Sequence, residues 1–211
     1  MRKALIGLLM GLAVATASEA AVGVSIGINI PAYPRLVAVP GYPVYYAPTL
    51  NANYFFYDGL YWVFEGDQWL ASSWYNGPWR VVGPEFVPLY LWQVPVRYYR
   101  RPPAYFHGWG RNYAPRWGEH WGPEWHARHD GWDRHDNHAR YSAAPLPTYQ
   151  RQYNGNRYPH PEQQAQLTSQ NYRYQPREQA AREHFSEQGI QHEANRAEGN
   201  RGQHEARGHD R

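Results

Sequence analysis

The chain has 211 residues, 42% of them hydrophobic, which is enough for one small folded domain, and its formal net charge at pH 7 is only +3. A charge so close to balance does not indicate a nucleic-acid partner, and we expect none. The absence of cysteine excludes disulfides, thiolate metal sites, cysteine nucleophiles and the lipid-modified cysteine of a bacterial lipoprotein.

Residues 1–20 have the pattern of a cleavable secretory signal peptide. Arg2 and Lys3 form a positive start, an apolar run follows over 4–15, and small residues precede Ala21. The run is shorter than the about 20 residues that a spanning helix needs, and two glycines within it disfavour a buried core helix. We therefore expect cleavage after Ala20, export to the periplasm or outer envelope, and a mature chain without a membrane span.

Residues 21–52 combine a strand signal with a proline-rich connector. From 22 to 30, branched residues alternate with Gly, Ser and Asn, which is the period-two pattern of a half-buried strand. Pro31 and Pro34 end this pattern. The stretch through Pro48 predicts extended connecting backbone that carries several tyrosines.

Residues 53–96 are densely aromatic, and their glycines fall where the chain must reverse. Apolar runs at 55–57, 60–64 and 68–71 are separated by Asp58-Gly59 and by Gly66-Asp67. Glycine accepts the positive φ that tight hairpin turns need, so the pattern predicts a three-stranded antiparallel meander.

The strands of this meander are expected to carry aromatic residues on both faces. Alternation places Trp62 and Phe64 on one face and Tyr61 on the other. A further strand is expected at 80–82, and prolines then confine residues 86–96 to an edge strand or polyproline-like backbone.

A short unit recurs in this region, consisting of an aromatic residue, a polar residue, glycine and a second aromatic residue. It occupies 56–62, 63–69 and 74–79, and the last copy reads Trp74-Tyr75-Asn76-Gly77-Pro78-Trp79. In these units the chain resembles the exported WXXGXW/YXWGXW-repeat proteins of Gram-negative bacteria over residues 54–132. The resemblance implies export and an envelope location, and it brings no assigned activity.

Residues 97–141 are rich in Arg, Trp, His and Gly. The spacing of Trp117, Trp121 and Trp125 is helical, although Gly118 and Gly122 argue against one continuous helix. A helix that begins at Pro123 and extends toward Tyr141 is expected instead, laying Trp125 and Trp132 on the sheet.

Residues 142–211 have a polar composition with no Trp, Val or Met and a single Ile, Ile190. Such a segment buries too little apolar surface to offset its chain entropy, so we expect a disordered polyampholyte tail. A short helix is expected within it over 176–188, supported by Glu178 and Arg182 at i,i+4 and ended by Gly189. The predicted fold class is therefore mainly β: a small antiparallel aromatic meander, a Trp/His/Gly segment, one short helix and a disordered tail.

The aromatic residues of the meander are the first candidate binding residues: Tyr57, Tyr61, Trp62, Trp69, Trp74, Tyr75 and Trp79. Such rings stack on sugar rings or peptide prolines, with Asp58, Asp67 and Asn76 supplying hydrogen bonds at the turns. The alternative is that the same rings form the core of a sheet that has few Leu, Ile and Met residues. Because both faces carry aromatics, we expect one face to be open to a partner.

Two charged motifs are further candidates. His126-x-x-His129 and His135-x-x-His138 place imidazole pairs three residues apart with aspartates between them, a pattern that suits Ni, Cu or Zn, and a solvated mixed-charge face is the alternative. Arg97, Arg100 and Arg101, among tyrosines, suit a phosphate or an acidic polymer, and a solvated connector is the alternative.

Catalytic motifs are not recognisable in the sequence. The carboxylates near the turns are single, the serines lack a nucleophile-elbow context, and neither a phosphate loop nor a dinucleotide fingerprint occurs. We expect an exported, non-enzymatic envelope protein without a cofactor, a structural or binding component that contacts envelope polysaccharide or peptidoglycan through aromatic residues. The alternative is a periplasmic His-rich protein that binds Ni, Cu or Zn.

Overall fold

A computed structural model describes residue 30, residues 33–134 and 141–147, and parts of the segment 163–186, namely 163, 166–167, 175–179, 181–183 and 186. The predicted signal peptide, the predicted strand at 22–30 apart from Ile30, and the candidate ligands His135 and His138 lie outside these residues. Among the described helices, none combines the length and the hydropathy that crossing a membrane requires.

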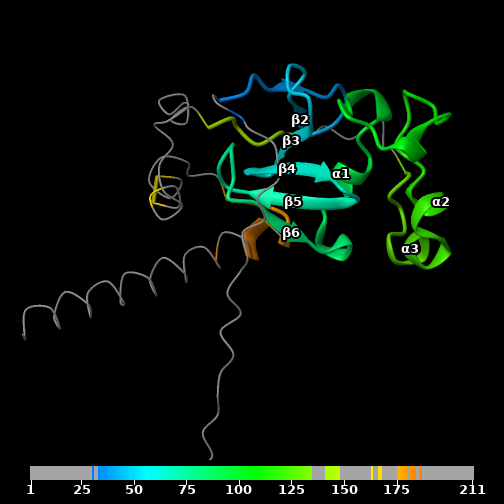
Figure 1. Cartoon of the computed structure of the whole chain (residues 1–211). Helices are drawn as coiled ribbons and strands as arrows, with labels where there is room; N and C mark the ends of the chain where they lie inside the picture. The colour runs from blue at the N-terminus through cyan, green and yellow to red at the C-terminus, as the bar shows by residue number, and fades with distance from the viewer. Residues whose placement is uncertain are drawn as a thin grey trace, which may run out of the picture.

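The centre of the molecule is a six-stranded antiparallel sheet whose strands follow one another in chain order (Figure 1). The strands are β1 (Val37–Ala38), β2 (Tyr45–Tyr46), β3 (Asn53–Tyr57), β4 (Leu60–Glu65), β5 (Gln68–Ser72) and β6 (Arg80–Val82). The predicted mainly-β fold is confirmed, and strands β3 to β6 lie where the apolar runs predict them.

The turns between the central strands explain why the meander forms where it does. Asp58 and Gly59 have φ values of 49° and 88°, and Gly66 and Asp67 have values of 56° and 65°. Positive φ at both central residues is the requirement of the type I′ hairpin turn, which Asp-Gly sequences favour. The pairing of Tyr57 with Leu60 therefore follows from the local sequence.

The predicted connector at 31–48 differs from expectation, because it adds strands β1 and β2 to the sheet. Tyr45 pairs with Phe56 of β3, and Val37 pairs with Tyr46. Proline lacks an N–H donor, so Pro40 and Pro43 limit each of these strands to two residues. Strands of only two residues are compatible with a sequence that has mainly the features of a connector.

Short helices cover one face of the sheet and lie together on the right of Figure 1. They are η1 (Pro84–Phe86), α1 (Leu89–Trp92), η2 (Val96–Tyr98), η3 (Ala104–Phe106), α2 (Trp117–Trp121) and α3 (Pro123–Arg128). The predicted edge strand or polyproline backbone over 86–96 is therefore wrong. Its prolines begin helical turns instead, with Pro88 and Pro95 at N-cap positions.

The tryptophans at 117, 121 and 125 do not share one helix. Gly122 has a φ of 87° and separates α2 from α3, as the glycines and Pro123 predicted. The helix that begins at Pro123 ends at Arg128, well before the predicted end near Tyr141. Trp125 and Trp132 are nevertheless buried in the core, at 4% and 7% exposure.

The sheet has a hydrophobic core on each face. On one face Phe55, Trp62 and Phe64 pack with tryptophans of the short helices, whereas Tyr61 lies on the opposite face, as the alternation predicts. The second face is covered by the 74–79 unit and by apolar residues from distant parts of the chain: Ile30, Tyr33, Leu36, Ala144, Leu146 and Leu167. Both faces are therefore occupied by the chain itself.

A buried asparagine fixes the helical layer to the sheet. Asn53, 2% exposed, donates from Nδ2 to the carbonyl oxygens of Phe64 at 3.1 Å and Arg101 at 2.6 Å, and its Oδ1 accepts from the Arg101 N–H at 2.8 Å. A buried amide with three partners is stable in a core. The loop at 100–101 is thus held at the start of β3, which positions the residues on either side of it.

The polar C-terminal segment also contacts the sheet. Asp58, in the β3–β4 turn, accepts hydrogen bonds from the backbone N–H groups of Arg177 at 3.0 Å and Glu178 at 2.8 Å. The Tyr57 hydroxyl donates to Glu178 Oε1 at 2.7 Å, and Ala181 is fully buried in the core. Within 142–211, predicted to be disordered, these residues and Ala144 pack against the domain.

The substitution Asp58→Asn is expected to loosen this C-terminal contact. Asparagine tolerates the positive φ of the turn, but it lacks the negative charge and one of the two acceptor oxygens of Asp58. The effect resembles the weakening of a helix N-cap, a contact that contributes about 0.5–2 kcal/mol to stability. The rate of tryptic cleavage after Arg177 and Arg182 should increase several-fold, because this rate follows the fraction of molecules in which the C-terminal segment is detached from the sheet. Asp130→Asn, which removes an exposed pair with Arg134, is the control, and equal cleavage rates in both variants would contradict the expectation.

Candidate functional site

The seven aromatic candidates of the meander are all buried. Their exposed fractions lie between 0% and 6%. Tyr57, Trp62 and Trp69 belong to the core beneath the short helices, and the other four pack on the opposite face: Tyr61, Trp74, Tyr75 and Trp79. Among the described residues, the structure thus places these seven rings in the core.

The polar residues of the turns are used within the molecule. Asp58 holds the C-terminal segment, Asp67 accepts from Tyr105 and contacts His120, and Asn76 Oδ1 accepts from the Ile30 N–H at 3.2 Å. Burial is the main cause that raises the pKa of Tyr57, and the adjacent Glu178 carboxylate raises it further. These groups stabilise contacts of the chain with itself.

The Trp-x-x-Gly-x-Trp unit is a packed turn. Gly77 has a φ of 88°, and a Cβ atom placed on it would lie 2.9 Å from Cδ1 of Trp79. The unit is pinned to the sheet because the Tyr54 hydroxyl donates to the Tyr75 carbonyl oxygen at 2.7 Å, and the Tyr54 ring meets Trp79 edge-on at 5.9 Å. The glycine of the motif therefore serves both backbone conformation and packing.

The described histidines of the predicted metal motif make structural contacts. His126 Nδ1 accepts from the Trp132 indole N–H at 3.0 Å. The His129 ring stacks on Trp125 at 4.1 Å, and its nitrogens lie 2.9 Å and 3.1 Å from the carbonyl oxygens of Trp125 and Pro84. Among the described residues, no three His, Asp, Glu or Cys side chains form a group that could hold a metal ion.

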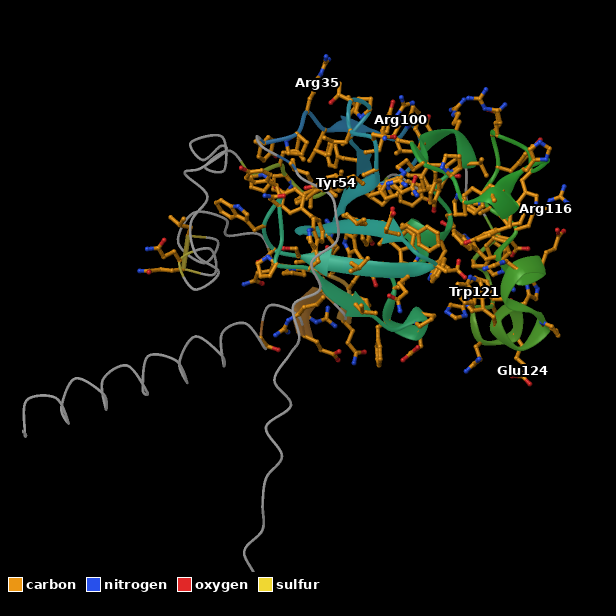
Figure 2. All side chains as sticks on the ribbon, viewed as in Figure 1. Arg35, Tyr54, Arg100, Arg116, Trp121 and Glu124 are labelled. Carbon is orange, nitrogen blue, oxygen red and sulfur yellow. The ribbon has the colours of Figure 1, made fainter. Side chains whose placement is uncertain are left out.

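A carboxylate, an imidazole and a phenol meet beside the β4–β5 turn. Tyr105 donates to Asp67 Oδ1 at 2.5 Å, His120 Nε2 lies 2.8 Å from Asp67 Oδ2, and the Tyr105 and His120 rings stack at 3.7 Å. Burial and the hydrogen bond to Asp67 raise the pKa of Tyr105, which keeps the phenol protonated. The cluster fastens η3 and α2 to the sheet, and Trp121, which is labelled in Figure 2, packs against His120 with the ring centres 4.8 Å apart.

A pocket of about 440 Å³ lies between the β1–β2 turn and the helical layer. It is lined by Tyr42, Gln93, Asn112, Tyr113, Ala114, Trp132 and Asp133. Its volume lies in the range of about 300–1,000 Å³ that is usual for small-molecule sites. Aromatic rings, two amides and one carboxylate thus converge on a space that is large enough for a sugar ring.

The walls of the pocket are positioned by backbone pairing and by buried hydrogen bonds. The N–H groups of Val96 and Arg97 donate to the carbonyl oxygens of Tyr113 and Arg111, both at 3.0 Å. Gln93, 5% exposed, donates from Nε2 to the carbonyl oxygen of Arg134 at 2.9 Å. The pocket is therefore built on parts of the chain that lie far apart in sequence.

Tyr113 is the most exposed aromatic residue of the pocket, at 75%. A Cβ atom on Gly110 would lie 2.9 Å from the Tyr113 ring, so the absence of a side chain at this position lets the ring lie over the backbone. Burial raises the pKa of Tyr42, a second tyrosine in the lining, and nearby tyrosines add to the effect. A tyrosine hydroxyl can donate as well as accept a hydrogen bond, so both walls offer polar contacts beside their rings.

Comparison with family models, with curated proteins and with solved structures finds no match to this chain. A function for the chain must therefore be inferred from the geometry of its pocket and the chemistry of the residues that line it.

Proposed function

We propose that this chain is an exported, non-enzymatic component of the bacterial cell envelope, and that its pocket binds the sugar rings of an envelope polysaccharide or of peptidoglycan. The observation that carries the proposal is that the pocket is lined by the rings of Tyr42 and Tyr113 and by the side chains of Gln93, Asn112 and Asp133, whereas Trp132, also in its lining, is largely buried. Aromatic faces pack on the apolar faces of sugars, and amides and carboxylates bind their hydroxyl groups.

The side chain of Gln93 provides the pocket with a polar group in a fixed orientation. Its amide nitrogen donates to the carbonyl oxygens of Gly131 and Arg134 at 3.4 Å and 2.9 Å, which holds the side chain in one orientation. Its Oε1 has no partner within the described part of the chain and is an acceptor for a ligand hydroxyl. A polar group that is already ordered binds with a smaller entropic cost than a mobile one.

The pocket replaces the meander as the binding surface in this proposal. The seven rings predicted to stack on a polymer are between 0% and 6% exposed, so a ligand would reach them only after unfolding of the cover on each face. Binding through aromatic residues is retained, but the rings that carry it are those of the connector and of the Trp/His/Gly segment.

Alanine at Tyr113 is expected to weaken glycan binding about tenfold, because an aromatic stacking contact contributes about 0.5–1.5 kcal/mol beyond its area. The measurement is a titration of the full mature chain with soluble peptidoglycan fragments and with purified envelope polysaccharide, followed by tryptophan fluorescence and calorimetry. Phe86→Ala is the matched control, because Phe86 is 50% exposed in η1 and does not line the pocket. Equal losses in the two variants, or no binding by the wild type, would refute the proposal.

The competing proposal is metal binding by His126, His129, His135 and His138. In the described part of the chain it requires His126 to give up the hydrogen bond from Trp132, at the wall of the pocket. Titration with Ni, Cu and Zn in the same assay separates the two. Tight metal binding that is abolished by alanine at the four histidines, with no response to glycan, would favour the metal protein.

A further inference from the structure

The segment that forms one wall of the pocket carries positive charge without local acidic residues. Residues 86–118 contain five arginines and no Asp or Glu. These arginines, which we call the arginine rim, are all exposed: Arg97, Arg100, Arg101, Arg111 and Arg116. Figure 2 shows Arg100 and Arg116 projecting outward from the helical layer. The sequence alone left open whether such arginines contact an acidic polymer or only solvent.

Only two members of the arginine rim have acidic partners among the described residues. Arg101 lies 3.5 Å from Glu65, and Arg116 lies 3.3 Å from Glu119. The Arg116–Glu119 pair is exposed and Glu65 is half-buried, and pairs so accessible to solvent exchange readily with other partners because each contributes little free energy. The guanidinium groups of Arg100 and Arg111 have no hydrogen-bond or ion-pair partner in the described part of the chain, so their charges are uncompensated.

Arg97 is held in place at the rim by neutral groups. Its guanidinium donates to Asn112 Oδ1 at 3.1 Å and to the Tyr98 hydroxyl at 2.8 Å, and it lies 4.8 Å from the centre of the Tyr98 ring. These contacts order the side chain without neutralising its charge. The remaining N–H donors of the Arg97 guanidinium can bind a planar anion. In this geometry arginine donates hydrogen bonds to two oxygen atoms at once.

Two members of the rim, Arg97 and Arg111, adjoin the pocket. The backbone pairing of Arg97 with Arg111 places these two residues side by side, and Asn112 and Tyr113, which follow Arg111, line the pocket. Asp133 is the one acidic residue in the lining, so the charge beside the pocket is net positive. A ligand whose sugar ring fills the pocket would extend its substituents toward Arg97 and Arg111.

We propose that the ligand of this pocket is an acidic polysaccharide, with the sugar ring in the pocket and its anionic substituents on Arg97 and Arg111. The inference rests on the proposed glycan-binding function and adds the charge of the ligand to it. The anionic group is a carboxylate or a phosphate ester, both of which match the guanidinium fork. Binding weakens with salt, because exposed charges are screened over about 10 Å at 0.1 M ionic strength.

The test compares ligands that share one backbone. Calorimetry on the full mature chain measures the affinity for two pairs of ligands. The first pair is oligogalacturonate and its methyl ester, in which the same carboxyl groups are neutral. The second pair is a phosphorylated dextran and plain dextran. We expect the charged member of at least one pair to bind at least tenfold more tightly, and this difference to shrink when NaCl is raised. The variant with both Arg97→Gln and Arg111→Gln should lose most of the difference, whereas Arg128→Gln on α3 should keep it.

The outcomes separate this inference from the proposed function. Equal binding of charged and neutral members, with loss on Tyr113→Ala, would overturn the inference and leave the glycan function in place. Binding of no oligosaccharide would overturn both. Stronger binding to vesicles that contain an anionic lipid than to either acidic glycan, with the same dependence on Arg97 and Arg111, would overturn the inference in favour of a membrane surface.

Discussion

Replacing Trp92 by alanine is expected to lower the free energy of unfolding by about 3–5 kcal/mol, the usual range when a large buried aromatic side chain is removed. Trp92 is 1% exposed at the end of α1. Its ring lies 5.7 Å from that of Trp69 on the sheet, 4.9 Å from Trp117 of α2 and 5.2 Å from Trp125 of α3. The substitution leaves a cavity where the sheet and three helices meet.

Urea unfolding followed by far-UV circular dichroism measures this loss. Phe86→Ala provides the control, because Phe86 is 50% exposed a few residues earlier and its removal should change stability by about 0.5 kcal/mol or less. Trp92→Phe should recover part of the loss, since it restores an aromatic ring to the cavity. A loss below about 1 kcal/mol in Trp92→Ala would show that the helical layer is not packed as the structure has it.

The sheet could be predicted from sequence because its determinants are local. The turns at Asp58-Gly59 and Gly66-Asp67 specify their own positive φ, and the runs between them have the length and the residue types of strands. The face of each residue then follows from alternation, which is why Trp62 and Tyr61 lie in different cores as expected.

The helical layer could not be predicted with the same rules. Proline at 84, 88, 95 and 103 fits polyproline backbone as well as the start of a helical turn, at the N-cap or the first helical position, and the sequence alone does not decide between them. The burial of side chains decides between the two conformations, because a helical turn at 89–92 brings Leu91 and Trp92 into the core together, whereas an extended chain would not. The choice is therefore made by contacts with residues distant in sequence.

The burial of the seven candidate rings has a related cause. Ten tryptophans and nineteen tyrosines in a chain with few Leu, Ile and Met residues must supply the core, so high aromatic density at 54–79 marks the core and not a binding surface. The pocket takes Tyr42, Gln93 and Tyr113 from separate segments, and no periodicity relates them. The local signal nearest to it was the run of arginines from Arg97, whose relation to Arg111 depends on backbone pairing.

Replacing Gly77 by alanine is expected to lower the free energy of unfolding by about 2–5 kcal/mol, the sum of a backbone cost and a packing cost. The φ of 88° is unfavourable for any residue with a Cβ atom, and that atom would lie 2.9 Å from Cδ1 and 3.2 Å from the backbone nitrogen of Trp79. Since Trp79 is 3% exposed and packs against Tyr54, relief of the overlap requires the indole to leave its place in the core.

Gly66→Ala is the matched comparison for this prediction. Gly66 also has a positive φ, 56°, but a Cβ atom there would meet nothing within 4 Å, so only the backbone cost of about 1–2 kcal/mol applies. Unfolding in urea, followed by near-UV circular dichroism of the tryptophans, measures both variants. A larger loss for Gly77→Ala, accompanied by a changed near-UV spectrum in the folded state, would show that the Trp-x-x-Gly-x-Trp unit is maintained by packing. Equal losses of unfolding free energy in the two variants would mean that the backbone conformation of the turn alone requires glycine at position 77. Trp79 would then be able to leave the core and contact something else.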